Sequence, residues 1–234
     1  SVTKAVIYLW LAAAVVAVVC IGIAQVARVL PTRKQVALEG LYEYIQDVMV
    51  GAVMPRQAAA AWFPYIATLF LFIFTSNIIG LVPLPHGVHF KTYAATSNIN
   101  VAAGLALLTF VLTHASGIRY NGVAGYFRGW VAASAPAPLK PLLFVIHAFS
   151  ELFRLVSLSV RLFANMLAGH MVMLVFYLLL LMLQSWLLFS LLAPLLELSV
   201  VAVSLFEVFV AVIQAYIFAI LSAVYIGGAI EQEH

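Results

Sequence analysis

The sequence predicts an all-α integral membrane protein with about five transmembrane helices and one interfacial amphipathic helix. Of its 234 residues, 66% are hydrophobic and only 8% are charged, whereas a soluble domain carries roughly 25% charged residues. The charged residues are also spaced so that long apolar stretches lie between them. Each stretch has about the ~20 residues that a helix needs to cross the hydrocarbon core of a bilayer.

The same composition excludes several other classes of protein. A disordered chain would combine low hydrophobicity with high charge. The single cysteine, Cys20, excludes an internal disulfide framework and a cysteine-clustered metal site. The net charge of +3 is too thinly spread for a nucleic-acid-binding surface.

Charge-free intervals in the first half of the chain predict three spans, at residues 5–27, 58–82 and 99–117. Between the first two, residues 36–54 form a predicted interfacial helix. Its acidic residues recur every four positions on one face, and its apolar residues lie largely on the other. The acidic residues are Glu39, Glu43 and Asp47, and the apolar residues are Leu38, Leu41, Tyr42, Ile45 and Met49. A solvated acidic face is the favoured interpretation, and the docking of a partner is the alternative.

Residues 141–230 are almost entirely apolar, and one helix of that length would be ~135 Å long. The segment therefore folds back, and we expect a long, tilted antiparallel hairpin of helices 141–184 and 189–230. The turn is expected near residue 188, where Gln184, Ser185, Trp186 and Pro194 disfavour an uninterrupted apolar helix. All five spans belong to one membrane domain, 1–234.

Basic residues in the short loops predict the orientation. Seven of them fall on one side: Arg28, Arg33, Lys34, Arg56, Arg119, Arg128 and Lys140. Only Lys4 and Lys91 fall on the other. This bias predicts that the N-terminus is outside and the C-terminus cytoplasmic. No secretory leader with a cleavage site is evident, and the chain begins at Ser1.

Polar residues inside the apolar hairpin mark the candidate site. A charge at mid-membrane costs about 2.5–3.5 kcal/mol on insertion scales, so such groups face protein or water and indicate an ion pathway. With a turn near residue 188, Arg161 lies at the depth of Gln214, and His170 lies at the depth of Glu207. Asn165 shares a helical face with Arg161.

These residues differ in what they can do with a proton. Arg161 stays protonated and acts as a fixed cation. Imidazole is the side-chain group that ordinarily gains or loses a proton near neutral pH, so His170 and Glu207 are interpreted as a proton relay in preference to a hydrogen-bonded packing histidine. Gln214 and Asn165 are expected to bridge helices by hydrogen bonds.

Four further polar residues of the hairpin are interpreted by spacing. Glu151 and Arg154, at i and i+3, form a plausible local ion pair. An ion pair between Glu151 and Arg161 is disfavoured, since ten residues separate them by ~15 Å. Glu197 lies near the turn, either at a channel mouth or at a hydrated helix end. Glu197 is therefore a possible channel-lining residue, and His147 and Glu151 are further candidates by the resemblance described next.

Several motifs resemble the a subunit of F-type ATP synthases, from about residue 35 to the C-terminus. The most specific is Ser157-Leu-Ser-Val-Arg-Leu-Phe-Ala-Asn-Met-Leu-Ala-Gly-His170, which is similar to the segment around the family's essential arginine. The segment Ile213-Gln-Ala-Tyr-Ile-Phe-Ala219 resembles the glutamine motif of the last helix. Residues 71–83 and 97–100 also look like family segments.

The resemblance implies a function. Arg161 would face a rotor ring, with Asn165 and Gln214 beside it, and His170 and Glu207 would line an ion half-channel. Some family members carry that pair in the order Glu then His, and many have an acidic residue at the position of His147. The implied protein is a non-catalytic stator subunit that passes protons to and from carboxylates of the c-ring. It would couple proton flow to ATP synthesis beside peripheral-stalk b subunits and the F1 sector, in a bacterial plasma membrane.

Other functions remain as alternatives. A haem- or quinone-binding subunit of a redox complex would use His114, His147 or His170 as ligands, although their spacing is unconvincing. An intramembrane hydrolase or a passive scaffold is also conceivable, but no metalloprotease motif is present and no phosphate-binding glycine motif occurs. We expect no cofactor, no metal and no nucleic acid. Protons are favoured over sodium ions because His170 and Glu207 suit them.

Overall fold

The computed structural model describes residues 4–26, 33–81, 94–131, 136–182 and 186–231, and the regular structure of these ranges is entirely helical. In chain order the elements are α1 (Lys4–Val26), α2 (Arg33–Glu43), the π-helix η1 (Tyr44–Val50), α3 (Arg56–Leu81), the 3-10 helix η2 (Ala95–Ser97), α4 (Ile99–Gly129), the 3-10 helix η3 (Ala137–Leu139), α5 (Lys140–Met182) and α6 (Trp186–Ile230). Five helices of the described part are long and apolar enough to cross a membrane. The all-α membrane class is therefore confirmed.

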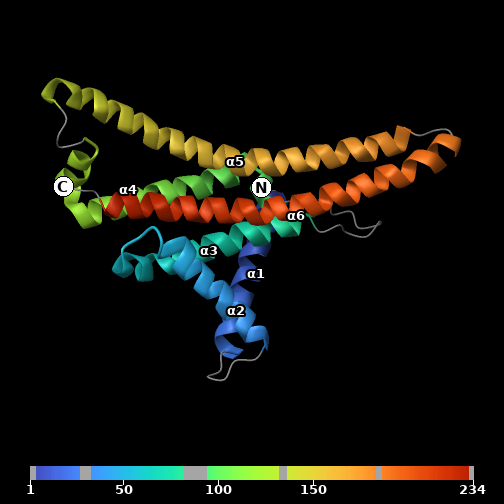
Figure 1. Ribbon diagram of the computed structural model, residues 1–234, viewed down its shortest axis with the longest axis horizontal. Helices are drawn as coiled ribbons and strands as arrows, with labels where there is room; N and C mark the ends of the chain where they lie inside the picture. The colour runs from blue at the N-terminus through green and yellow to red at the C-terminus, as the bar shows by residue number, and fades with distance from the viewer. Residues whose placement is uncertain (1–3, 27–32, 82–93, 132–135, 183–185, 232–234) are drawn as a thin grey trace.

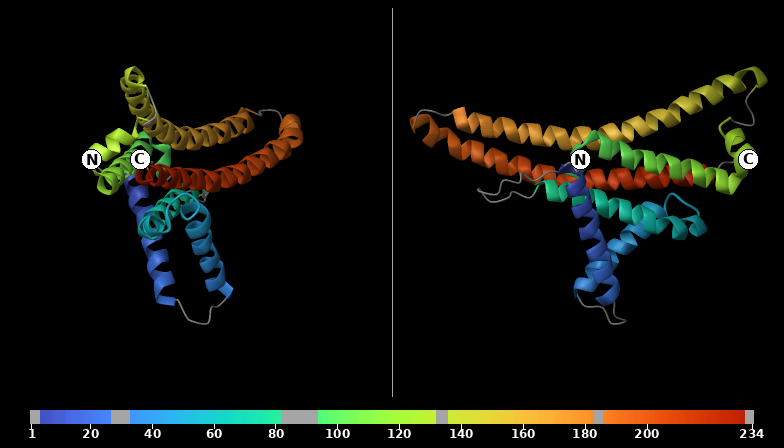
Figure 2. Two further views of the ribbon diagram at one scale, coloured as in Figure 1. Left: turned by 60° about the vertical axis from the view of Figure 1, so that its left-hand side comes forward. Right: turned by 180° about the vertical axis from the view of Figure 1, so that it is seen from behind.

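The α5/α6 hairpin forms the long axis of the molecule (Figure 1). Helices α3 and α4 pack along α6, and α4 also packs against α5. Helix α1 crosses the direction of the hairpin and projects away from it beside α2 (Figure 2). With 43 and 45 residues, α5 and α6 are each about 65 Å long, twice the ~30 Å thickness of the hydrocarbon core. The hairpin therefore has to lie strongly tilted in a bilayer.

The connection of the hairpin differs from the prediction. Helix α5 ends at Met182 and α6 begins at Trp186, so the connection precedes residue 188, and Gln184 and Ser185 lie outside the described residues. Pro194 lies inside α6 rather than in a turn. The N-terminal end of α6, which follows the connection, curves toward α5 (Figure 1). Proline removes an intrahelical hydrogen bond and tolerates such a bend, which explains why it does not end the helix.

The register of the hairpin nevertheless agrees with the prediction. The Ser204 hydroxyl donates to the sulfur of Met173 across 3.5 Å, and Gly169 directly contacts the carboxyl of Glu207. Both pairs are centred within one residue of position 188. The first residues of α6 lie in its curved N-terminal end. The centre of the paired residues, near position 188, therefore differs from the connection, which precedes Trp186.

Helix α4 corrects a second expectation. The third span is expected to end at residue 117, but helical structure continues to Gly129. It consists of two helical segments joined at Gly122, where φ is 70°, a left-handed conformation that glycine adopts without a steric cost. Asn121 donates to the carbonyls of Ala229 (2.9 Å) and Ile230 (3.5 Å), which ties the kink to the last turn of α6. Polar residues lower the hydropathy here, and the chain is helical on both sides of the kink.

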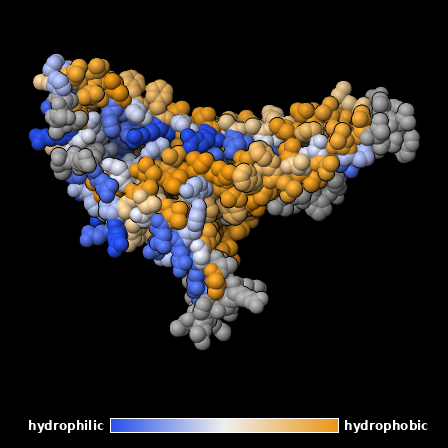
Figure 3. All heavy atoms as spheres, viewed as in Figure 1, coloured by the Kyte–Doolittle hydropathy of each residue, from blue (hydrophilic) through white to orange (hydrophobic). Residues whose placement is uncertain are grey.

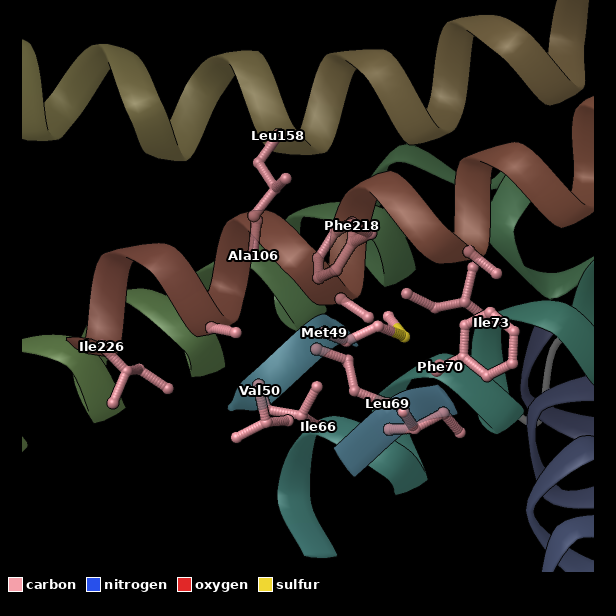
Figure 4. Close-up of a cluster of buried hydrophobic side chains, with 14 of the residues drawn as sticks. Met49, Val50, Ile66, Leu69, Phe70, Ile73, Ala106, Leu158, Phe218 and Ile226 are labelled. Carbon is pink, nitrogen blue, oxygen red and sulfur yellow. The ribbon is translucent and has the colours of Figure 1, made fainter. Parts of the chain in front are cut away.

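A core of apolar side chains joins η1, α3 and α6 (Figure 4). Met49 and Ile66 pack there with Phe218, and all three are almost completely buried. The predicted two faces of residues 36–54 are observed only in part. Glu39, Glu43 and Asp47 are exposed and Ile45 and Met49 are buried, but Leu41 and Tyr42 are exposed, and the side chain of Leu38 is not described. The buried face packs on α3 and α6, so this segment supports the hairpin.

Candidate functional site

Hydrophilic residues run along α5 into the middle of an otherwise apolar hairpin (Figure 3). Arg161 lies on α5 and is exposed on the surface of the chain. No hydrogen bond or ion pair of its guanidinium is found in the described part of the chain. Its neighbours Leu158 and Leu162 are buried against the bundle. Arg161 is therefore an exposed cation without a partner among the described residues.

The surface beside Arg161 is apolar. Val156 and Val160 on α5 and Val212 on α6 are exposed by 54%, 46% and 40%. An arginine in such surroundings is costly to hold in a bilayer unless a partner or water reaches it. Glu151 is not the partner of Arg161, as the spacing along α5 predicts, because it contacts His147 and Arg154 instead.

Asn165 lies one helical turn after Arg161 and contacts α6. Its amide Nδ2 donates to Oε1 of Gln214 across 3.3 Å. Gln214 is 3% exposed, and its Nε2 has no hydrogen-bond partner among the described residues. The predicted helix-bridging role of these two amides is thus realised, with Gln214 bonded to Asn165 one turn away from Arg161.

A cavity of about 230 Å³ lies on the other side of Asn165, toward the connection of the hairpin. We call it the His170 cavity. It is lined by polar groups at Asn165, His170 and Glu207 and otherwise by apolar residues such as Val203. The hairpin therefore brings His170 and Glu207 to one cavity, as their matched depths predicted.

The two titratable groups of the His170 cavity are held differently. His170 Nδ1 lies 2.7 Å from the carbonyl oxygen of Met166. Because a carbonyl only accepts, Nδ1 carries the hydrogen and Nε2 remains free to accept a proton. Glu207 is 7% exposed, and neither of its carboxyl oxygens has a hydrogen-bond partner among the described residues. A buried carboxyl without a partner is unfavourable when ionised, so it favours proton uptake or contact with water.

Gly169 makes room for that carboxyl. A Cβ at this position would lie 2.3 Å from Oε1 of Glu207, far inside van der Waals contact. Sequence reasoning missed this role, and the only signal for it was the place of the glycine next to His170. Glu207 can occupy its position because residue 169 has no side chain.

A second cavity, of about 320 Å³, lies on the opposite side of Arg161, toward the C-terminal end of α6. We call it the His147 cavity. Its polar lining includes His147, Glu151 and Arg154 on α5 and Tyr225 on α6. Arg154 Nη1 donates to Glu151 Oε1, and His147 Nε2 lies 3.4 Å from the same oxygen. The predicted local pair of Glu151 with Arg154 is confirmed, and Tyr225 was not anticipated.

Other predicted residues lie outside these cavities. Glu197 is exposed on α6 and lines neither the His170 nor the His147 cavity. His114 bonds the carbonyl oxygen of Phe110 (2.9 Å) and packs against Tyr126. Within the described residues, no group of three or more His, Cys, Asp or Glu side chains is arranged to hold a metal ion.

Sequence reasoning also missed a buried polar contact that holds α3 to α6. The Thr96 hydroxyl donates to Oδ1 of Asn77 across 2.6 Å, and Asn77 Nδ2 donates to the carbonyl of Ala211 across 3.5 Å. Both side chains are completely buried. The contact stabilises α6 three residues before Gln214.

The fold and the site define a multi-pass helical membrane protein whose α5/α6 hairpin carries an exposed arginine, without a partner among the described residues, between two cavities that contain titratable side chains. The family model described as ATP synthase A chain matches residues 6–227. The chain belongs to this family.

Curated relatives agree with the family model. Proteins named ATP synthase subunit a are similar to this chain in Rubrobacter xylanophilus (42% identical, covering 97% of this chain and 83% of the relative), Gluconacetobacter diazotrophicus (40%, 87% and 78%) and Granulibacter bethesdensis (38%, 93% and 83%). The redox-subunit alternative is not favoured by these similarities.

Proposed function

We propose that this chain is the stator subunit of the membrane sector of an F-type ATP synthase. It provides two half-channels that pass protons to and from carboxylates on a rotating c-ring, and so couples proton flow to ATP synthesis. The observation that carries the proposal is the place of Arg161, an exposed cation with no partner among the described residues, on an apolar surface between the His170 cavity and the His147 cavity.

In this proposal the His170 cavity delivers protons. Nε2 of His170 accepts a proton from water, and the buried Glu207 shares it and releases it toward the ring. A ring carboxylate that takes up the proton becomes neutral and can turn into lipid, where a charge would be costly.

Arg161 acts where the ring carboxyl returns. A fixed cation stabilises the ionised form of a nearby carboxyl, so the proton leaves toward the His147 cavity. Because the guanidinium does not lose its proton, it also prevents direct leakage between the two cavities. Each elementary charge that crosses 100 mV contributes about 2.3 kcal/mol, so several protons are needed for each nucleotide made.

The proposed partners follow from this role. The exposed apolar surface around Arg161 suits a ring of helices, and peripheral-stalk b subunits and the F1 sector complete the complex. The chain itself is proposed to be non-catalytic. The loop charges support a location in the bacterial plasma membrane, with the N-terminus outside and the C-terminus cytoplasmic.

The test is Arg161→Ala, with Arg161→Lys and Arg128→Ala as comparisons. ATP-driven acidification of inverted vesicles measures proton pumping, and the yield of purified complex measures assembly. We expect Arg161→Ala to reduce pumping by at least about 100-fold in an assembled complex. Arg128, an exposed residue of α4, should be replaceable. Normal pumping by Arg161→Ala would favour a passive scaffold and overturn the proposal.

A further inference from the structure

The His147 cavity contains a cluster of charged and titratable side chains, and the proposed function does not say what each of them does. Glu151 lies at its centre, between Arg154 on one side and His147 on the other. The ring of Trp130 on α4 lies 4.9 Å from that of His147. Three helices therefore contribute to the surroundings of one carboxylate, since Tyr225 of α6 also lines the cavity.

Arg154 is held from two directions. Its Nη1 donates to Glu151, while its Cζ lies 4.9 Å from the centre of the Tyr225 ring, within range of a cation–π contact. The seven residues from Arg154 to Arg161 are almost two complete helical turns, so both arginines project from nearly the same side of α5. Arg154 has partners on its own chain, whereas Arg161 has none among the described residues, so the two cations have different roles.

Burial indicates which member of the ion pair supports the other. The Glu151 side chain is 8% exposed, whereas that of Arg154 is 39% exposed. Desolvation therefore falls mainly on the Glu151 carboxylate, and the Arg154 cation compensates for its lost hydration. The arginine keeps contact with its surroundings and has less need of a counter-ion. We therefore interpret the ion pair as one in which Arg154 stabilises the Glu151 carboxylate, rather than one in which Glu151 neutralises Arg154.

Glu151 also stands between two spaces. On one side is the His147 cavity. On the other is a smaller cavity of about 10 Å³, lined by Glu151, Arg154, Tyr225 and Leu158 among others, which has room for about one water molecule. Leu158 precedes Arg161 by three residues. A proton released beside Arg161 would therefore meet Glu151 before it meets His147.

We propose that Glu151 is the proton acceptor of the exit half-channel and that Arg154, braced by Tyr225, is the positioning residue that keeps it ionised and oriented. The proposal rests on the proposed function. The proton leaves a ring carboxyl and binds the carboxylate of Glu151. It then moves to Nε2 of His147 and from there to water in the His147 cavity, while Arg154 keeps its charge throughout.

The other titratable groups near Glu151 come from the neighbouring helices. Tyr126 and Tyr225 line the same cavity, and His114 packs against Tyr126. A proton held by Glu151 therefore has His147 as its nearest imidazole partner, at 3.4 Å.

The experiment measures ATP synthesis driven by an imposed proton gradient in vesicles that contain the whole complex, at several values of pH on the exit side. The variants are Glu151→Gln, Arg154→Gln, Arg154→Lys and the double variant Glu151→Gln/Arg154→Gln. Glu39→Gln, an exposed carboxylate of α2, is the control for loss of one acidic group. The yield of purified complex shows assembly for each.

We expect Glu151→Gln to lower the rate at least about tenfold, because a general acid–base group is lost. Arg154→Gln should lower it about three- to tenfold and change its dependence on exit-side pH, since Glu151 is then less well held. Arg154→Lys should recover part of the rate. The double variant should stay as slow as Glu151→Gln.

Tyr225 provides an independent arm. Tyr225→Phe keeps the ring under Arg154 and should stay within about twofold of the original rate, whereas Tyr225→Leu should resemble Arg154→Gln. Recovery of the double variant to the original rate would show that Glu151 only neutralises Arg154 and would overturn the inference. So would a normal rate for Glu151→Gln. Either result leaves Arg161→Ala inactive if the proposed function holds, so the two failures are distinguishable.

Discussion

Asn165 on α5 donates a hydrogen bond to Gln214 on α6 across 3.3 Å, one helical turn from Arg161, which has no partner among the described residues. This contact joins the two long helices next to the cation. Asn165 also lines the His170 cavity. It therefore lies along α5 between Arg161 and His170.

The first prediction concerns this amide pair. Asn165→Leu and Gln214→Leu should each destabilise the purified complex, and a double-mutant cycle on thermal unfolding should give a coupling of about 0.6 kcal/mol, typical of hydrogen bonds between membrane helices. Strictly additive effects would indicate that the hydrogen bond does not stabilise the hairpin.

Gly169→Ala is expected to impair proton pumping severalfold, because the new Cβ would displace the Glu207 carboxyl from its position 2.3 Å away. ATP-driven acidification of inverted vesicles measures the effect. Gly104→Ala is the matched control: it also lies within a helix, and a Cβ there meets nothing within 4 Å. Equal pumping by the two variants would mean that the carboxyl position does not matter.

Exchange of the pair in the His170 cavity tests the relay. His170→Glu combined with Glu207→His should retain more transport than either single change, since both groups line the same cavity and the exchange keeps one imidazole and one carboxyl there. The same vesicle assay applies, with Glu197→Gln as a control at an exposed carboxylate of α6. A double variant no better than the worse single variant would argue against a relay.

The two cavities should be accessible from opposite sides of the membrane. In a Cys20→Ser background, which removes the chain's only thiol, Val203→Cys lies at the His170 cavity and Gly228→Cys at the His147 cavity. A membrane-impermeant thiol reagent should modify residue 203 in right-side-out vesicles and residue 228 in inverted vesicles. Labelling is measured by mass spectrometry. Modification of both from one side would contradict the two half-channels.

Much of this architecture could be predicted from local chemistry. Apolar stretches between charges identified the spans, because removing a charge from water is costly wherever it occurs in the chain. The register of the hairpin was also predictable, since the polar residues of both helices have to meet at the same depth. The position of the connection between α5 and α6 was not predictable, because α6 continues through Pro194. Whether a proline bends a helix or ends it depends on how the surrounding residues pack.

The continuation of α4 shows the same limit. The residues after 117 lower the hydropathy, and the kinked segment is held by contacts with distant residues: Asn121 donates to the end of α6, and Phe127 packs near Phe144 of α5. Gly169 and Tyr225 could not be assigned either, since their roles consist of contacts with residues 38 and 71 positions away in the chain.

By itself, the sequence determined the membrane class, the helical spans and the presence of titratable groups in the hairpin, because hydration costs depend on residue type alone. Spacing along α5 already indicated the ion pair of Arg154 with Glu151. Only the tertiary structure decided that Arg154 also meets the ring of Tyr225 on α6, whereas Arg161 meets no partner among the described residues. Contacts between helices depend on where each helix places its side chains, which spacing along one helix does not specify.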